Sequence, residues 1–173
     1  RAWDPAYCIG AERLTNGEII SLEDVTPQIE VVYTPGHTSD SVCFFIWSGV
    51  PHESTLEGIV TGDTIAGRHT TMISETDGDL GLYLKTLALL EERGSGVKLL
   101  PGHGPDGFDV ASFAHWYIER RQQRLTQLKA AQAKLGPDAS LKELIDEIYD
   151  DVDPVLRGAA EQSTRVALRY LAE

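Results

Sequence analysis

The sequence predicts an α/β unit followed by a smaller unit made only of helices. Short runs rich in β-branched and aromatic residues, bounded by Gly and Pro, recur up to about residue 106. From Asp109 onward the apolar residues recur at helical spacing instead. In addition, three of the strand-like runs end at a glycine that is followed by His or Asp. We therefore divide the chain into residues 1–106, which are α/β, and residues 107–173, which are helical.

The first unit is expected to hold five short strands and one helix. A turn at Asn16-Gly17 precedes the first strand, and the strands are predicted at 18–22, 29–34, 42–47, 57–61 and 97–100. Asp79 is expected to cap a helix over 80–93, which Gly94 ends.

The second unit is expected to hold three helices. One long helix over 110–135 stops at Gly136-Pro137. Ser140 and Glu143 form a capping box that opens a second helix, which runs to about Tyr149. The third helix is expected to start near Pro154.

The charge of the chain limits its partners. Lys and Arg number 15 against 27 Asp and Glu, a net charge of −12. Such a charge disfavours passive attraction to nucleic acid or to an anionic membrane, although charge alone says no more than that the chain is soluble. No apolar run approaches the roughly 20 residues that span a bilayer.

The two cysteines indicate a reducing compartment. Cys8 and Cys43 form neither a CxxC pair nor a disulfide framework, so we expect a cytoplasmic protein. Cys43 lies in an apolar run and is expected to be a core residue.

Three segments share one design, in which an apolar strand ends at Gly beside a candidate metal ligand. They deliver Gly36-His37, Gly62-Asp63 and Gly102-His103. A strand end supports a side chain rigidly, and the glycine lets the backbone turn sharply. Each segment alone is weak evidence, because a His or Asp beside Gly is usually a turn residue. The three together are hard to explain by packing, since His and Asp are poor core residues. Two imidazoles and a carboxylate suit zinc, manganese or iron.

The segments Thr34-Pro35-Gly36-His37-Thr38-Ser39-Asp40-Ser41, Thr61-Gly62-Asp63-Thr64 and Pro101-Gly102-His103-Gly104 resemble the later motifs of the metallo-β-lactamase superfamily, closest to its glyoxalase II and β-lactamase-like branches. This resemblance covers residues from about 15 to 106. It implies that His37 binds one metal, that His103 binds a second, and that Asp63 bridges the two. The family's first motif, His-x-His-x-Asp-His, supplies four further ligands and does not occur in this sequence.

The resemblance implies a fold and a chemistry. The fold is an αββα sandwich of two similar halves, and residues 1–106 resemble the second half. The chain also begins at Arg1 without an initiator Met, so we expect that residue 1 is not the natural start. The implied chemistry is hydrolysis of an ester, thioester, lactone or phosphodiester by a hydroxide bridging two divalent metals, in which Asp63 helps to orient the hydroxide. The chain alone is expected to be inactive and to bind metal weakly or not at all.

A second hypothesis is a non-catalytic fragment that folds by association. An incomplete sandwich exposes apolar surface, which would pair with the missing N-terminal half or with another copy. The enzyme hypothesis instead predicts a small-molecule substrate as the main partner, with nucleic acid disfavoured and no membrane.

Several polar residues near the motifs have two interpretations each. Arg68 and His69 follow Asp63 and are candidates for substrate binding, or members of an ordinary polar loop. Asp40 either supports the His37 loop by a hydrogen bond or is an exposed turn residue. The cluster Arg120, Arg121 and Arg124 is more simply explained as a solvated helix face than as a phosphate site.

The helical unit carries a looser resemblance. Residues 141–149, together with Asp153-Pro154 and Ala159-Ala160-Glu161, are similar to the winged-helix-like C-terminal domain of the β-lactamase-like-protein-2 branch. This resemblance implies a lid or wall over the substrate.

Overall fold

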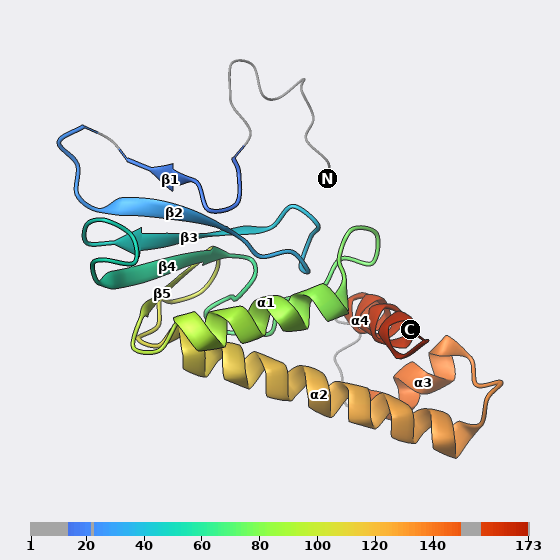
Figure 1. Cartoon of the computed structure of the whole chain (residues 1–173). Coiled ribbons are helices and arrows are strands. Elements are labelled where there is room, and N and C mark those ends of the chain that lie inside the picture. Colours follow the sequence, from blue (N-terminus) through green and yellow to red (C-terminus); the bar gives the residue numbers. More distant parts are fainter. Residues whose placement is uncertain (1–13, 22, 150–156, 173) are drawn as a thin grey trace.

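A computed structural model of the chain describes residues 14–21, 23–149 and 157–172 (Figure 1). The elements follow the order β1 (Ile19–Ile20), β2 (Gln28–Tyr33), β3 (Val42–Trp47), β4 (Leu56–Gly62), α1 (Leu80–Arg93), β5 (Lys98–Pro101), α2 (Val110–Leu135), α3 (Leu141–Ile148) and α4 (Arg157–Ala172). The predicted strand at 42–47 and the predicted helices at 80–93 and 110–135 are confirmed residue by residue. The bounds of the other described elements differ from the predicted bounds by no more than three residues at each end. Cys8 and Pro154 lie outside the described residues.

The five strands form one sheet in the order β1-β2-β3-β4-β5. The first four pair as antiparallel neighbours, whereas β4 and β5 are parallel because α1 crosses over between them. As a result β2, β4 and β5 run in the same direction. Their carboxyl ends therefore meet at one edge of the sheet.

Helices α1 and α2 lie on one face of the sheet, as Figure 1 shows, and α3 and α4 pack against the other helices. The side chains on this face are fully or nearly fully buried, and they include Cys43, Phe45, Trp47, Ile59 and Leu99. This confirms the core placement of Cys43. Burial also raises the pKa of the Cys43 thiol to about 11, because a thiolate would be desolvated there.

The opposite face of the sheet is apolar but only partly covered. Strand residues alternate between the two faces, so the neighbours of the buried set point away from the helices. Five apolar residues on this side are partly exposed, namely Ile29, Phe44, Ile46, Val60 and Leu100, whereas Val31, which pairs with Phe44 on the same side, is fully buried. We call the five partly exposed residues the open face. A second layer could cover it without any change in the sheet.

Caps are present at three helix starts, and those at Asp79 and Ser140 were predicted from the sequence. Asp79 accepts a hydrogen bond from the Leu82 backbone, Asp109 accepts one from the Ser112 backbone, and Ser140 with Glu143 forms the complete capping box. Such caps satisfy backbone donors that have no partner within the helix.

Helices α2, α3 and α4 share a core with the sheet. Leu128 and Ala131 of α2, Leu144 of α3 and Val166 of α4 belong to the same buried cluster as the sheet residues. The described part of this region contains helices without strands, so the similarity to a winged helix stays a prediction. No described helix has both the length and the apolar character needed to cross a membrane.

Candidate metal centre

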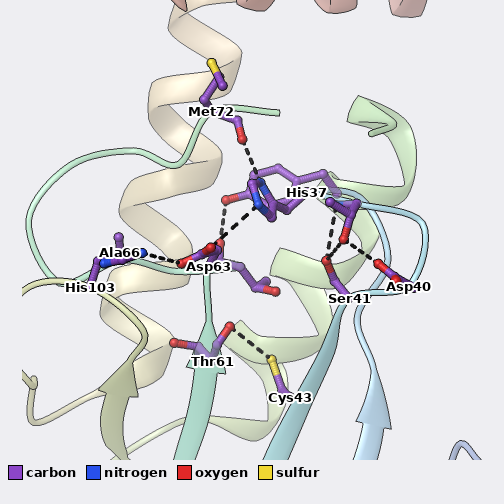
Figure 2. A network of polar contacts seen from close by, with 12 residues as sticks. His37, Asp40, Ser41, Cys43, Thr61, Asp63, Ala66, Met72 and His103 are labelled. Atoms are coloured by element: carbon purple, nitrogen blue, oxygen red, sulfur yellow. Dashed lines mark hydrogen bonds and ion pairs between the residues drawn. The ribbon is translucent and has the colours of Figure 1, made fainter. Parts of the chain in front are cut away.

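The three predicted ligands come together at the edge of the sheet where β2, β4 and β5 end. His37 follows β2 after Thr34-Pro35-Gly36, Asp63 directly follows β4, and His103 follows β5 after Gly102. Asp63 lies between the two histidines (Figure 2). Its Oδ2 is 4.0 Å from Nε2 of His37, and its Oδ1 is 3.4 Å from Nε2 of His103. Each carboxylate oxygen thus faces a different imidazole.

Two glycines are required for this approach. A Cβ added at Gly36 would lie 2.3 Å from the Tyr83 Cα, and the Gly36 φ angle of 138° disfavours any other residue. A Cβ added at Gly102 would lie 3.1 Å from Oδ1 of Asp63. Gly102 also donates its backbone N–H to the Gly62 carbonyl at 2.8 Å, which links the β4 and β5 ends. A side chain at either glycine would therefore displace a candidate ligand.

The His37 ring is held by a backbone carbonyl. Its Nδ1 lies 2.7 Å from the Met72 carbonyl oxygen, which can only accept a hydrogen bond, so Nδ1 carries the proton (Figure 2). Nε2, the atom that faces Asp63, then has a free lone pair. Metal-binding histidines commonly have this arrangement, in which the other ring nitrogen donates to a carbonyl or carboxylate.

The loop around His37 is braced by short side-chain hydrogen bonds. Thr38 donates from Oγ1 to Oδ1 of Asp40 at 2.9 Å, and its backbone N–H donates to Oγ of Ser41 at 3.1 Å. Asp40 is exposed, and its carboxylate accepts this hydrogen bond within the loop that carries His37.

The three candidate ligands are open to solvent on one side. The side chains of His37, Asp63 and His103 are 23%, 48% and 80% exposed. Among the described residues, no group of three or more His, Cys, Asp and Glu side chains is placed so that it could hold a metal ion by itself. The chain thus offers two imidazoles and a carboxylate that lie close together, with room for ligands from elsewhere on the exposed side.

Arg68 and His69 do not join the three candidate ligands. They lie on the loop that follows Asp63 and line a separate cavity between this loop and the helices. Both side chains are exposed. Their role in substrate binding stays a prediction, and it requires that the substrate enters this cavity.

Tyr117 of α2 fixes that loop, and the sequence contained no signal for this role. Its hydroxyl accepts a hydrogen bond from the Ala66 N–H at 2.9 Å, and it contacts the carbonyl oxygens of Ala66, at 3.0 Å, and of His69. Tyr117 is fully buried, and burial is the main reason that its pKa is raised. The loop between Asp63 and Met72 is thus attached to α2.

The arginine cluster on α2 differs from its favoured interpretation. Arg120 is exposed, as a solvated helix face requires. Arg121 and Arg124 are partly buried, because Arg121 donates to the Thr71 carbonyl and Arg124 lies 4.0 Å from the centre of the Tyr149 ring. All three line the same cavity as Arg68 and His69.

The chain is similar in sequence to several curated proteins. An atrochrysone carboxyl ACP thioesterase of Aspergillus fumigatus is 30% identical over 120 residues, which are 69% of this chain and 34% of that protein. A lactamase-like protein of Pestalotiopsis fici is 27% identical over 172 residues, 95% of this chain and 50% of that protein. The chain therefore spans between about a third and a half of the length of these curated relatives. No family profile matches it.

Two solved structures share the fold. A β-lactamase domain protein from Burkholderia ambifaria superposes with a TM-score of 0.76 at 20% identity, over 94% of this chain and 47% of that one. A metallo-β-lactamase family protein from Thermus thermophilus superposes with a TM-score of 0.71 at 22% identity, over 94% and 49% of the two chains. In both cases the match includes the helical tail as well as the sheet.

Proposed function

Because the chain belongs to the metallo-β-lactamase superfamily, we propose that it forms part of a metal-dependent hydrolase that cleaves a thioester. His37 and His103 are the proposed ligands of two separate divalent ions, and Asp63 is the ligand that the two ions share.

The observation that carries this proposal is the position of Asp63. A carboxylate that points one oxygen at each of two histidines, at 4.0 and 3.4 Å, has the orientation that a bridging ligand needs. A plain ion pair would require only one of these contacts. The side chains also project from three strand ends, which hold them rigidly.

The donor set fits the proposed ions. Imidazole and carboxylate groups suit zinc first, and manganese or iron as alternatives. When bound, such a pair of ions lowers the pKa of a coordinated water towards about 7 and polarises the carbonyl group that is attacked.

The chain's own residues prepare the site. The Met72 carbonyl fixes the His37 tautomer and leaves Nε2 free, and the Thr38–Asp40–Ser41 hydrogen bonds hold the loop that carries His37. Asp63 would hold both ions and, through them, the attacking water. The exposed side of the cluster leaves access for substrate and for further ligands.

The thioester substrate is supported by the relatives, of which three are named as ACP thioesterases. An ester, a lactone and a phosphodiester are the alternatives, because the same metal chemistry can cleave each of them. A panel of one compound of each class, assayed with the same protein, ranks them directly.

The experiment compares metal content and hydrolysis in single-ligand variants. We expect His37→Ala, Asp63→Asn and His103→Ala each to lower bound metal, and thioester hydrolysis by roughly 100-fold or more, in the longest natural form of the protein that contains this chain. His115→Gln is the matched control, because His115 is exposed on α2 and pairs with Glu91 and Glu119 instead. If all three ligand variants keep the metal content and the activity of the unmodified protein, the proposal is wrong.

The open face supports a second candidate function, a non-catalytic unit that acts by association. Five apolar strand residues share this face and are partly exposed. If the 173-residue chain forms a stable dimer, and Phe44→Ser with Ile46→Ser makes it monomeric, association through this face is supported. A purified chain that holds about two metals per molecule and cleaves a thioester would exclude the non-catalytic function.

A further inference from the structure

A cavity of about 720 Å³ lies between the loop after Asp63 and helices α2 and α4. Its size falls in the range of cavities that hold small organic ligands, roughly 300–1,000 Å³. The lining comes from residues 68–73 of the loop, from the middle of α2 and from residues 159–167 of α4. Among its described lining residues there is no Asp or Glu, although acidic residues outnumber basic ones in the whole chain.

Four arginines line this cavity: Arg68, Arg120, Arg121 and Arg124. None of them forms an ion pair with a described carboxylate. Arg124 donates to the Ile148 carbonyl, and Arg120 lies 5.4 Å from the centre of the Trp116 ring. Four guanidinium groups without a carboxylate partner in the described part of the chain make this site electropositive, although the chain as a whole is acidic.

Arg121 is the most constrained of the four. It donates to the Thr71 carbonyl and lies 5.4 Å from the centre of the Tyr83 ring. Its Nε is buried and has no hydrogen-bond partner among the described residues. Buried donors of this kind are uncommon in native proteins, so Arg121 keeps one hydrogen-bond donor that the described residues do not satisfy.

Apolar side chains form the majority of the rest of the lining, together with polar residues such as Gln123 and Ser163. Met72, Ile73 and Leu80 lie on the side of the loop and α1, and Leu125 and Val166 lie on the helices opposite. A ligand that fits both parts needs an anionic group for the arginines and an apolar portion for this wall. Guanidinium groups bind phosphate and carboxylate oxygens with paired hydrogen bonds.

We propose that this cavity binds an acyl compound through its phosphate or carboxylate group, with the acyl portion against the apolar wall. The inference rests on the proposed function only in taking this compound to be the substrate or product of the His37–Asp63–His103 site. The loop connects the cavity to the candidate metal centre. Met72 lines the cavity, and its carbonyl oxygen accepts the hydrogen bond from the His37 ring.

Binding is tested by calorimetry with three probes that share one alkyl chain. Octyl phosphate and octanoate carry the two candidate anions, and octanamide is the neutral match. We expect at least one anion to bind roughly tenfold or more tightly than octanamide, with an affinity that falls as salt is raised. The tighter of the two anions identifies the group that the cavity recognises.

The variant Arg68→Gln/Arg120→Gln removes two guanidinium groups that are exposed, so the fold is spared. This variant should bind the preferred anion with roughly tenfold lower affinity. Lys85→Gln/Lys129→Gln removes the same charge from exposed positions on α1 and α2 outside the cavity, and it should leave the affinity within about twofold.

Three results would overturn the inference: no probe binds, octanamide binds as tightly as the anions, or both double variants weaken binding equally. A six-nucleotide single-stranded RNA that displaces the probes from the cavity at a lower concentration than either anion would also overturn the inference. In that case the cavity would be a nucleic-acid site. Because binding is measured without turnover, Asp63→Asn should keep it. Arginine-dependent binding in a protein that hydrolyses none of the substrates would therefore refute the proposed function and leave the inference standing.

Discussion

Removal of the Tyr117 hydroxyl should loosen the loop that separates the candidate metal centre from the arginine-lined cavity. The change Tyr117→Phe keeps the buried ring and deletes one oxygen. That oxygen accepts from the Ala66 N–H, and its one proton is donated to the Ala66 or the His69 carbonyl, so an N–H and a carbonyl group lose their partner. A buried polar group left without a partner costs about 1–3 kcal/mol, and Ala66 is only partly buried, so we expect a loss of about 2–3 kcal/mol in the free energy of unfolding.

Two further tyrosines provide a graded comparison with the same chemical change. The Tyr83 hydroxyl donates to a single carbonyl, that of Thr64 at 2.6 Å, so Tyr83→Phe should cost about 1–2 kcal/mol. Tyr170 has no hydrogen bond from its hydroxyl to any described residue, and Tyr170→Phe should change the stability by less than about 0.5 kcal/mol.

Urea unfolding followed by tryptophan fluorescence measures this series. With a slope of about 2–3 kcal/mol/M, Tyr117→Phe should lower the midpoint by roughly 1 M. Amide hydrogen exchange provides the local readout, since the Ala66 N–H should exchange faster in Tyr117→Phe and not in Tyr83→Phe. Equal midpoints for Tyr117→Phe and Tyr170→Phe, or an unchanged exchange rate at Ala66, would refute the reasoning.

Three other predictions concern groups outside the candidate centre. At about pH 8 the Cys43 thiol should resist iodoacetamide in the folded protein and react after unfolding, because its pKa is about 11; rapid native modification of its tryptic peptide would contradict this. The His115 pKa is raised, mainly by its hydrogen bond to Glu91, so the pair should add stability below the unfolded pKa of about 6.5 and lose it as the pH rises through the folded value. Glu91→Gln should lower the His115 pKa in an NMR titration, and an unchanged titration would show that the hydrogen bond does not form in solution. Arg93→Met should lower the free energy of unfolding by about 2–3 kcal/mol, because it removes the guanidinium group that pairs with the nearly buried Glu30 carboxylate. Urea unfolding measures this loss, and a value below about 0.5 kcal/mol would show that the pair contributes little.

The candidate ligands could be predicted from the sequence because their placement depends on local rules. Each lies at the end of a strand next to a glycine, and strand ends and glycine turns can be recognised within a few residues. The carboxyl ends of β2, β4 and β5 share one edge because β3 runs in the opposite direction between β2 and β4, and because α1 crosses over between β4 and β5. The sequence therefore indicated which residues would meet.

The tertiary structure alone decided what the arginines do. A helical pattern places Arg120, Arg121 and Arg124 on α2, but it does not state which neighbour covers that part of the helix. The neighbours are the loop at residues 68–73 and helix α4, which lie about 50 residues before and 40 residues after the arginines in the sequence. Their approach depends on how α1, α2 and α4 pack together, and packing is set by the shapes of many side chains at once. The sequence by itself thus determined the fold class and the three residues at the sheet edge, whereas the cavity and the Tyr117 contacts that hold its wall were decided only when the helices packed.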